Sequence, residues 1–301
     1  MDNLSTYEYF QEVHLWPLTK DLNYVQWLEN FAEGEEREIA KHVLDFFIYI
    51  PDNHVNQMVQ IVVGKCGYFF KNVVSGWGHD SFINNCWYSF IPGETPSYTD
   101  SGFIFTRKLR EEAGIPDERI LGFEQLIFKL LNETSPQNVI LVDDFVGSGS
   151  QCDFAWNNHV LGKTGLTLSA LASKGHHIVY APLIVNEMGK KRIETRCKGL
   201  ELVYLHLLKK EYSLFNVDGL CWKGDITLYN KWLALFDKIC RQENIPLTGG
   251  KHVNDGKGFG EQGLAIAFSH GIPDACPALF YWNTDTWKRL IKKHYQYGCK
   301  R

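Results

Sequence analysis

The sequence lacks several features that would narrow its function at once. Its eight cysteines include no Cys-x-x-Cys pair, which excludes the common zinc and dithiol redox motifs. Its 31 basic residues do not exceed its 35 acidic ones, so it lacks the positive charge typical of proteins that bind duplex nucleic acid. No apolar run approaches the roughly 18 residues of a membrane span, and the acidic N-terminus is unlike a signal peptide. These absences predict a cytoplasmic protein with reduced thiols and no membrane partner.

The sequence does have enough apolar and aromatic residues for a large core. Of its 301 residues, 45% are hydrophobic, 14% aromatic and 22% charged. This composition excludes a disordered chain and a small scaffold held together by disulfides. No repeat or low-complexity segment interrupts the chain, so we expect one continuous folded protein.

Apolar residues recur at helical spacing in the first quarter of the chain. The clearest of them are Trp27, Leu28, Phe31, Val43 and Leu44. Spacings of three and four residues place such side chains on one face of a helix. The pattern predicts a helical N-terminal region over residues 1–75.

From about residue 83, short apolar runs alternate with amphipathic segments. The expected strands are 82–91, 139–142, 178–185, 200–205 and 263–268. The expected helices are 103–113, 123–131, 187–197 and 228–241. Strands separated by helices are typical of an α/β fold with a mostly parallel sheet, here over residues 76–301. Ligands of such sheets bind at the carboxyl ends of the strands.

One segment, NVILVDDFVGSGSQ from Asn138 to Gln151, combines the elements of a binding site. A buried strand delivers Asp143 and Asp144 to its carboxyl end, and a glycine- and serine-rich turn then enters a helix. Backbone N–H groups at a helix N-terminus favour a phosphate, and glycines let the backbone approach it. Carboxylates suit ribose hydroxyls, directly or through hydrated Mg²⁺. The segment therefore predicts a site for a ribose phosphate.

The same segment resembles the binding motif of the phosphoribosyltransferases. The resemblance implies that Asp143 and Asp144 meet the ribose hydroxyls of phosphoribosyl pyrophosphate (PRPP) with Mg²⁺ nearby, in direct or indirect contact. It implies that the loop wraps the 5′-phosphate with Gly147, Ser148, Gly149, Ser150 and Gln151. Ser148 replaces the usual Thr and keeps a hydroxyl, whereas Gln151 replaces the last Thr and loses one. Gly147 stands where purine-salvage members carry an acid, which argues against that activity.

A second phosphate loop is expected upstream, because a pyrophosphate group needs donors of its own. The candidate segment runs over residues 96–102 and opens into the predicted helix 103–113. Its expected pyrophosphate-binding residues are Asp100, Ser101, Gly102 and Arg107, with Lys108 as an alternative cation. A polar turn that merely caps an amphipathic helix is the alternative interpretation.

The whole chain resembles a group of phosphoribosyltransferase-like proteins, the PRTase-CE type. The matching segments are Trp27-Leu28 with Asn30-Phe31, Asp100-Ser101-Gly102, the acidic strand, Tyr180–Ile184 with Glu187, and Gly271–Asp274 with Pro277 and Trp282. The resemblance implies a type I phosphoribosyltransferase architecture preceded by a helical region. It also implies a place in prokaryotic conflict and antiviral defence, with a defence-system protein or a nucleoprotein as partner. The resemblance also implies a homodimer, because dimers are common among the phosphoribosyltransferases.

Two classes of function remain open for such a site. In the first, a Mg²⁺-dependent phosphoribosyltransferase, a pentosyl/glycosyl transferase, moves the ribose phosphate of PRPP to an acceptor. The protein would mainly position and neutralise charge, so no strong catalytic base is needed. In the second, a non-catalytic module senses a nucleotide or ribose phosphate and docks a partner.

A third interpretation comes from Asp144-Phe145-Val146-Gly147-Ser148-Gly149, which resembles the cofactor turn of amino-methyltransferases that use S-adenosylmethionine. Those enzymes also carry an Asp/Asn-Pro-Pro-aromatic tetrapeptide that holds the target amine. This sequence contains no Pro-Pro pair. The paired acids at the end of the strand also favour a ribose phosphate.

Overall fold

The computed structural model describes residues 5–17, 21–78, 81–92, 101–159, 165–247 and 256–293. Packing groups the chain into two compact units. The sheet unit comprises Asn56–Leu208, and the terminal unit combines Met1–Val55 with Lys209–Arg301. These units do not follow the division at residue 75 that the sequence pattern suggested. The difference arises because most of helix α4 (Asp52–Val73) belongs to the sheet unit, while the C-terminal segment groups with the first helices.

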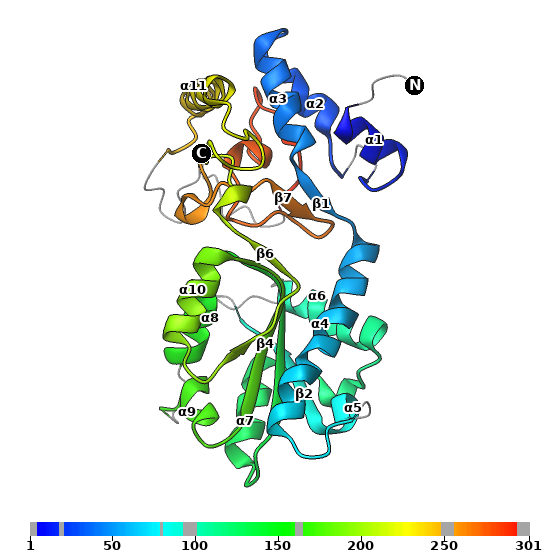
Figure 1. Cartoon of the computed structure of the whole chain (residues 1–301). Coiled ribbons are helices and arrows are strands. Elements are labelled where there is room, and N and C mark those ends of the chain that lie inside the picture. Colours follow the sequence, from blue (N-terminus) through cyan, green and yellow to red (C-terminus); the bar gives the residue numbers. More distant parts are fainter. Residues whose placement is uncertain are drawn as a thin grey trace. The chain divides into compact units, whose positions relative to one another are not determined.

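The sheet unit is built on a parallel sheet (Figure 1). Its strands are β2 (Cys86–Phe90), β3 (Asn138–Val146), β4 (His177–Asn186), β5 (Glu201–Leu202) and β6 (His206–Leu208). The order is β2-β3-β4-β5, and β6 also pairs with β4. All four pairings are parallel, which confirms the predicted α/β class.

Helices cover both faces of this sheet (Figure 1). One face packs against α7 (Phe123–Asn132), α8 (Ser150–Asn157), α9 (Leu168–Ala172) and α10 (Glu187–Arg196). The other packs against α6 (Ser101–Ala113). The long central strand β4 is buried along nearly its whole length, as expected for a parallel strand covered on both faces. No helix in the described ranges is long and apolar enough to cross a membrane.

Local patterns predicted the helices better than the strands. The helix expected at 103–113 is α6, and the one expected at 123–131 is α7, whose N-terminal Gly122 N–H donates to the Gln125 side chain. The strand expected at 82–91 is shorter, because α5 (Ser81–Asn85) precedes β2. The strand expected at 139–142 is longer, because it pairs with β4 as far as Val146. Short apolar runs do not by themselves define where strand pairing stops.

The terminal unit brings the first and last parts of the chain together. Strand β1 (Ile48–Ile50) pairs in parallel with β7 (Ile266–Phe268). Helices of this unit include α1 (Thr6–Glu12), α2 (Tyr24–Glu29) and α3 (Glu35–Asp45), in agreement with the helical spacing there. The amphipathic α11 (Ile226–Gln242), close to its predicted bounds, belongs to this unit as well.

An aromatic cluster fixes the two ends of the chain to one another. Trp27 of α2 is fully buried, and its indole N–H donates to the Leu279 carbonyl oxygen at 3.0 Å. The indole of Trp287 donates to the same oxygen, also at 3.0 Å. Nearby, Asn30 exchanges two hydrogen bonds with the backbone of Lys288, one of 2.7 Å and one of 2.8 Å. Early and late segments of the sequence therefore form a single core.

Truncating the centre of this cluster is expected to destabilise the protein strongly. Trp27→Ala should lower the free energy of unfolding by about 3–5 kcal/mol, since a large buried side chain and its hydrogen bond are both lost. Val25→Ala on the exposed side of the same helix is the control and should change it by less than about 0.5 kcal/mol. Urea denaturation measures both, and equal effects would contradict this description of the core.

Candidate functional site

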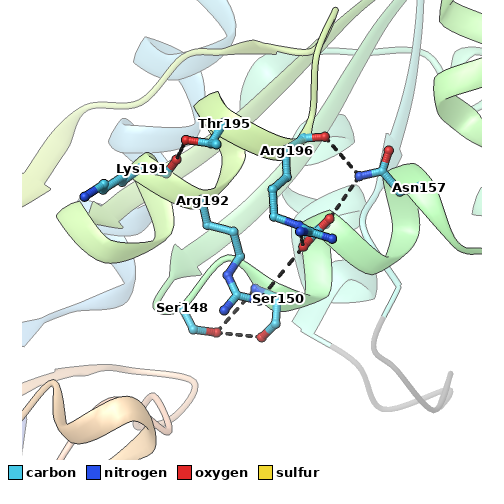
Figure 2. Close-up of polar contacts among 8 residues, drawn as sticks. Ser148, Ser150, Asn157, Lys191, Arg192, Thr195 and Arg196 are labelled. Carbon is cyan, nitrogen blue, oxygen red and sulfur yellow. Dashed lines mark hydrogen bonds and ion pairs between the residues drawn. The ribbon is translucent and has the colours of Figure 1, made fainter.

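The loop between β3 and α8 has the geometry of an anion site. Gly149 adopts the left-handed conformation, with φ of 73°, and α8 begins at the next residue. The Ser148 and Ser150 hydroxyl oxygens lie 2.6 Å apart, and the Ser150 N–H donates to Ser148 Oγ at 3.3 Å (Figure 2). The first N–H groups of a helix have no partner within it and point outward. This loop therefore presents two hydroxyls and backbone donors at one point.

Helix α10 lies directly on this loop, backbone against backbone. A Cβ on Gly189 would lie 2.5 Å from the Gly147 carbonyl oxygen and 2.6 Å from a methyl carbon of Val146. A Cβ on Gly149 would lie 2.9 Å from the Gly189 carbonyl oxygen. Real Cβ atoms do not approach that closely, so only glycine fits at either position. The three glycines hold the first turn of α10 against the entrance to α8.

The two predicted acids are neighbours near the end of β3, which stays paired with β4 on either side of them. Asp143 faces the side of α8 and α10, where Tyr180 belongs to the apolar cluster. Asp144 is only partly buried. Its carboxylate lies close enough to act on the pKa of Asp143. The structure therefore places the two acids together beside the loop, one buried and one partly exposed.

Asp143 is held inside the protein. Only 6% of it is exposed. Its carboxylate accepts a hydrogen bond of 2.6 Å from the Tyr180 hydroxyl and one of 3.0 Å from the Asp144 N–H. Burial, followed by the charge of Asp144, raises the pKa of Asp143 well above its usual range, and the Tyr180 hydrogen bond opposes that shift. Asp143 is thus buried and hydrogen-bonded, whereas Asp144 is the more accessible of the two acids.

Gln151, the last residue predicted to wrap the phosphate, makes a different contact. Its side-chain amide donates to the carbonyl oxygen of Ile91, just beyond β2, at 3.2 Å. The first turn of α8 is thereby attached to the end of the neighbouring strand. In the described structure, the Gln151 side chain connects two parts of the scaffold, while its backbone N–H remains in the first turn of α8.

Of the predicted pyrophosphate loop, residues 96–102, the structure describes only the last two residues. Asp100 lies outside the described residues, and α6 begins at Ser101. Gly102 presses on β2, because a Cβ there would lie 2.2 Å from the Phe90 ring. Phe90 pairs with Val142, next to the acids. The N-terminus of α6 therefore lies at the carboxyl edge of the sheet, near the end of β3 that carries the acids.

The two cations considered for this second loop lie on different sides of α6. Arg107 is exposed, and its guanidinium contacts Glu111 at 2.8 Å. Lys108 is only 8% exposed, and its ammonium donates to the side-chain oxygen of Asn56 on α4 at 2.5 Å. The inward position of Lys108 follows from its spacing of three residues from the buried Phe105, a pattern visible in the sequence.

The acids do not form a metal-binding cluster of their own. No group of three or more His, Cys, Asp or Glu side chains suited to a metal occurs among the described residues. Asp143 already accepts two hydrogen bonds and is buried, so it does not fit a direct ligand. Asp144 is accessible enough to hold Mg²⁺ together with a phosphorylated ligand, because Mg²⁺ often uses one carboxylate, water and phosphate oxygens.

Sequence reasoning missed two residues that shape this site. Tyr180 was noted only as part of a resemblance, although it lies opposite Leu141 on the neighbouring strand and reaches Asp143. Gly189 was not predicted to matter, although a glycine inside a helix lowers the stability of that helix and therefore indicates a packing constraint. Both signals were present in the sequence, but their meaning depends on the pairing of β3 with β4 and on the position of α10.

A parallel sheet whose strand β3 passes through two acids into a glycine-rich helix entrance is consistent with a phosphoribosyltransferase-like protein. Comparison with protein families agrees with this class. The PRTase-CE family model matches residues 24–293, so the chain belongs to the PRTase-CE family. A comparison with curated proteins found no match.

Adding a methyl group at the contact between α10 and the loop should destabilise the protein. Gly189→Ala brings a Cβ within 2.5 Å of a backbone oxygen that cannot move without displacing the loop. We expect a loss of about 1–3 kcal/mol in the free energy of unfolding. Gly64→Ala is the matched control, because nothing lies within 4 Å of its Cβ on the exposed side of α4. That control should be neutral or stabilise by up to about 1 kcal/mol, and a neutral Gly189→Ala would contradict the close contact.

The buried carboxyl of Asp143 should make stability depend on pH. Its folded-state pKa lies well above 3.8, so folding favours the protonated form. The stability that this group contributes is complete below the unfolded pKa and is lost as pH rises through the folded one. Asp143→Asn removes that loss, so its stability relative to wild type should increase as pH is raised from about 4 to about 8.

Thermal denaturation over this pH range measures the difference between the two proteins. Asp117→Asn, at an exposed carboxyl with 72% of its side chain accessible, is the control for the change in charge. A difference between wild type and Asp143→Asn that stays constant with pH would contradict the raised pKa.

Proposed function

We propose that this protein binds a ribose 5-phosphate ligand of the PRPP type together with Mg²⁺. The observation that carries the proposal is the entrance to α8, where Ser148, Gly149 and Ser150 present hydroxyls and N–H groups directly after an acidic strand. Membership of a phosphoribosyltransferase-like family supports it. The 5′-phosphate would occupy this entrance, with the ribose toward Asp144.

The two acids would have different roles in this complex. Asp144 would approach the ribose hydroxyls or a hydrated Mg²⁺, since it is the partly exposed carboxylate. Asp143 would hold the end of the strand in place through Tyr180. The pyrophosphate would lie at the N-terminus of α6, near Gly102. The bound Mg²⁺ would supply positive charge to the phosphate oxygens.

In a catalytic version, the bond between ribose C1 and the pyrophosphate oxygen breaks as a bond from C1 to the acceptor forms. Positive charge builds up on the ribose ring, and the pyrophosphate leaves with the bonding electrons. The protein would contribute by orienting the ribose and neutralising the leaving group. The acceptor would deliver the nucleophilic atom, so the class of reaction is pentosyl transfer.

Two observations favour the second candidate, a non-catalytic sensor of a nucleotide or ribose phosphate. Gln151 binds the Ile91 carbonyl, and Asp143 is buried, so fewer groups meet the ligand than in the family motif. In either version, we propose that the chain acts in a prokaryotic antiviral defence system, and its resemblance to defence-associated proteins supports this. Its partner there would be a defence protein or a nucleoprotein, and the chain would act as a monomer or a homodimer.

Calorimetric titration with PRPP, with and without Mg²⁺, tests the proposal. Wild type should show saturable binding that needs Mg²⁺. Asp144→Asn should weaken binding about 10-fold or more, because a charge-assisted contact is lost. Asp117→Asn makes the same change in charge at an exposed site of the same unit and should bind as wild type does. Absence of PRPP binding by folded wild type would contradict the proposal. Release of pyrophosphate on addition of an acceptor would show that the protein is an enzyme and not only a sensor.

A further inference from the structure

Helix α10 carries a run of basic residues, and its first turn lies against the α8 entrance. The contact of Gly189 with Gly147 and Gly149 fixes where its first turn lies. Beyond that turn, the chain continues with Lys190, Lys191 and Arg192, and Arg196 follows one turn later. Because the helix is held at the loop by backbone contacts, the direction in which each of these side chains points is defined.

The basic side chains of α10 differ in their partners. Lys190 is paired with Glu194 at 2.5 Å, one turn along the same helix. Arg196 donates its Nε–H to Asp153 of α8, also at 2.5 Å. Lys191 points away from α8 (Figure 2). Arg192 points toward the loop that carries Ser148 and Ser150 in the same view (Figure 2).

The guanidinium N–H donors of Arg192 are available to a ligand in this position. Its guanidinium lies 3.9 Å from Asp153, which is too long for a hydrogen bond. Within the part of the chain that the structure describes, Arg192 makes no side-chain hydrogen bond, and 42% of its side chain is exposed. A guanidinium carries five N–H donors in a planar arrangement that matches phosphate oxygens.

The local charge also favours an anion. Asp153 lies in the first turn of α8, where a carboxylate would repel a phosphate at the helix entrance. Its side chain is only 11% exposed, and Arg196 compensates its charge. Two arginines therefore face one buried carboxylate, and Arg192 supplies the excess positive charge on the side of α10 that points toward the loop (Figure 2).

We infer that Arg192 binds the phosphate group of the ligand at the α8 entrance, and that the Asp153–Arg196 pair positions α10 so that it can. This inference rests on the proposed function and adds a side chain to a site otherwise made of backbone N–H groups and hydroxyls. It makes the site selective for a phosphorylated ribose over an unphosphorylated one. Asp153 would have a positioning role, because its carboxylate contacts Arg196 of α10.

The test compares PRPP binding by wild type, Arg192→Ala and Lys191→Ala through calorimetric titration in the presence of Mg²⁺. Arg192→Ala should weaken binding about 10- to 100-fold, as expected for the loss of a charge-assisted, bidentate contact. Lys191→Ala removes the same charge from the adjacent residue and should change affinity less than about 2-fold. Arg192→Lys keeps the charge without the planar fork and should lie between wild type and Arg192→Ala.

A second probe separates contact with the phosphate from a general structural effect. Ribose 5-phosphate carries only the phosphate that Arg192 is inferred to bind. The ratio of its affinities for wild type and Arg192→Ala should match the ratio found for PRPP. Thermal melting should show Arg192→Ala and Lys191→Ala folded, since Arg192 makes no side-chain hydrogen bond within the described residues and its 3.9 Å contact with Asp153 is long. Should Arg192→Ala unfold, Arg192→Gln, which keeps much of the length of the side chain, provides the uncharged comparison with Arg192→Lys.

The possible results distinguish this inference from the proposal beneath it. Binding by wild type that is unchanged in Arg192→Ala would overturn the role of Arg192 and leave the proposed function intact. An equal loss in Lys191→Ala would also overturn it, because the effect would then be general electrostatic attraction. Absence of binding by folded wild type would overturn both.

Discussion

The site depends on the absence of side chains at two glycines, Gly149 and Gly189. Gly147 and Gly149 lie in the loop and Gly189 in the first turn of α10, and their backbones approach one another more closely than any Cβ would allow. This contact holds α10 against the entrance of α8. The position of the serine hydroxyls, the exposure of the first N–H groups of α8 and the direction of Arg192 all follow from it. The loop is thus part of a rigid junction between two helices.

The acidic strand shows how one motif can assign two roles to neighbouring carboxylates. Asp143 and Asp144 are neighbours in a strand that stays paired on both sides of them, yet they differ in burial. Asp143 is buried at an electrostatic cost that the Tyr180 hydroxyl partly offsets. Asp144 keeps partial access to solvent. The two helix entrances, at α8 and α6, lie on opposite faces of the sheet near the end of this strand.

Features that depend on local pattern were predictable from the sequence. The α/β class, helices α6, α7 and α11, and the order of strand, acids, glycine loop and helix follow from spacing within a few residues. Features that depend on distant pairing were not. Tyr180 reaches Asp143 across 37 positions of sequence, and Gln151 reaches Ile91 across 60. The grouping of both chain ends into one unit rests on contacts such as Trp27 with Leu279, 252 positions apart, which no local pattern reveals.

The central claim is that the β3–α8 loop receives the phosphate of a ribose phosphate. Hydrogen–deuterium exchange of the backbone, with and without PRPP and Mg²⁺, tests it most directly, because the N–H groups that bind the anion report on it themselves. The account predicts slower exchange in peptides that span residues 147–152 and little change in α11 of the terminal unit. Unchanged exchange over residues 147–152, at a PRPP concentration that slows exchange elsewhere, would contradict the account.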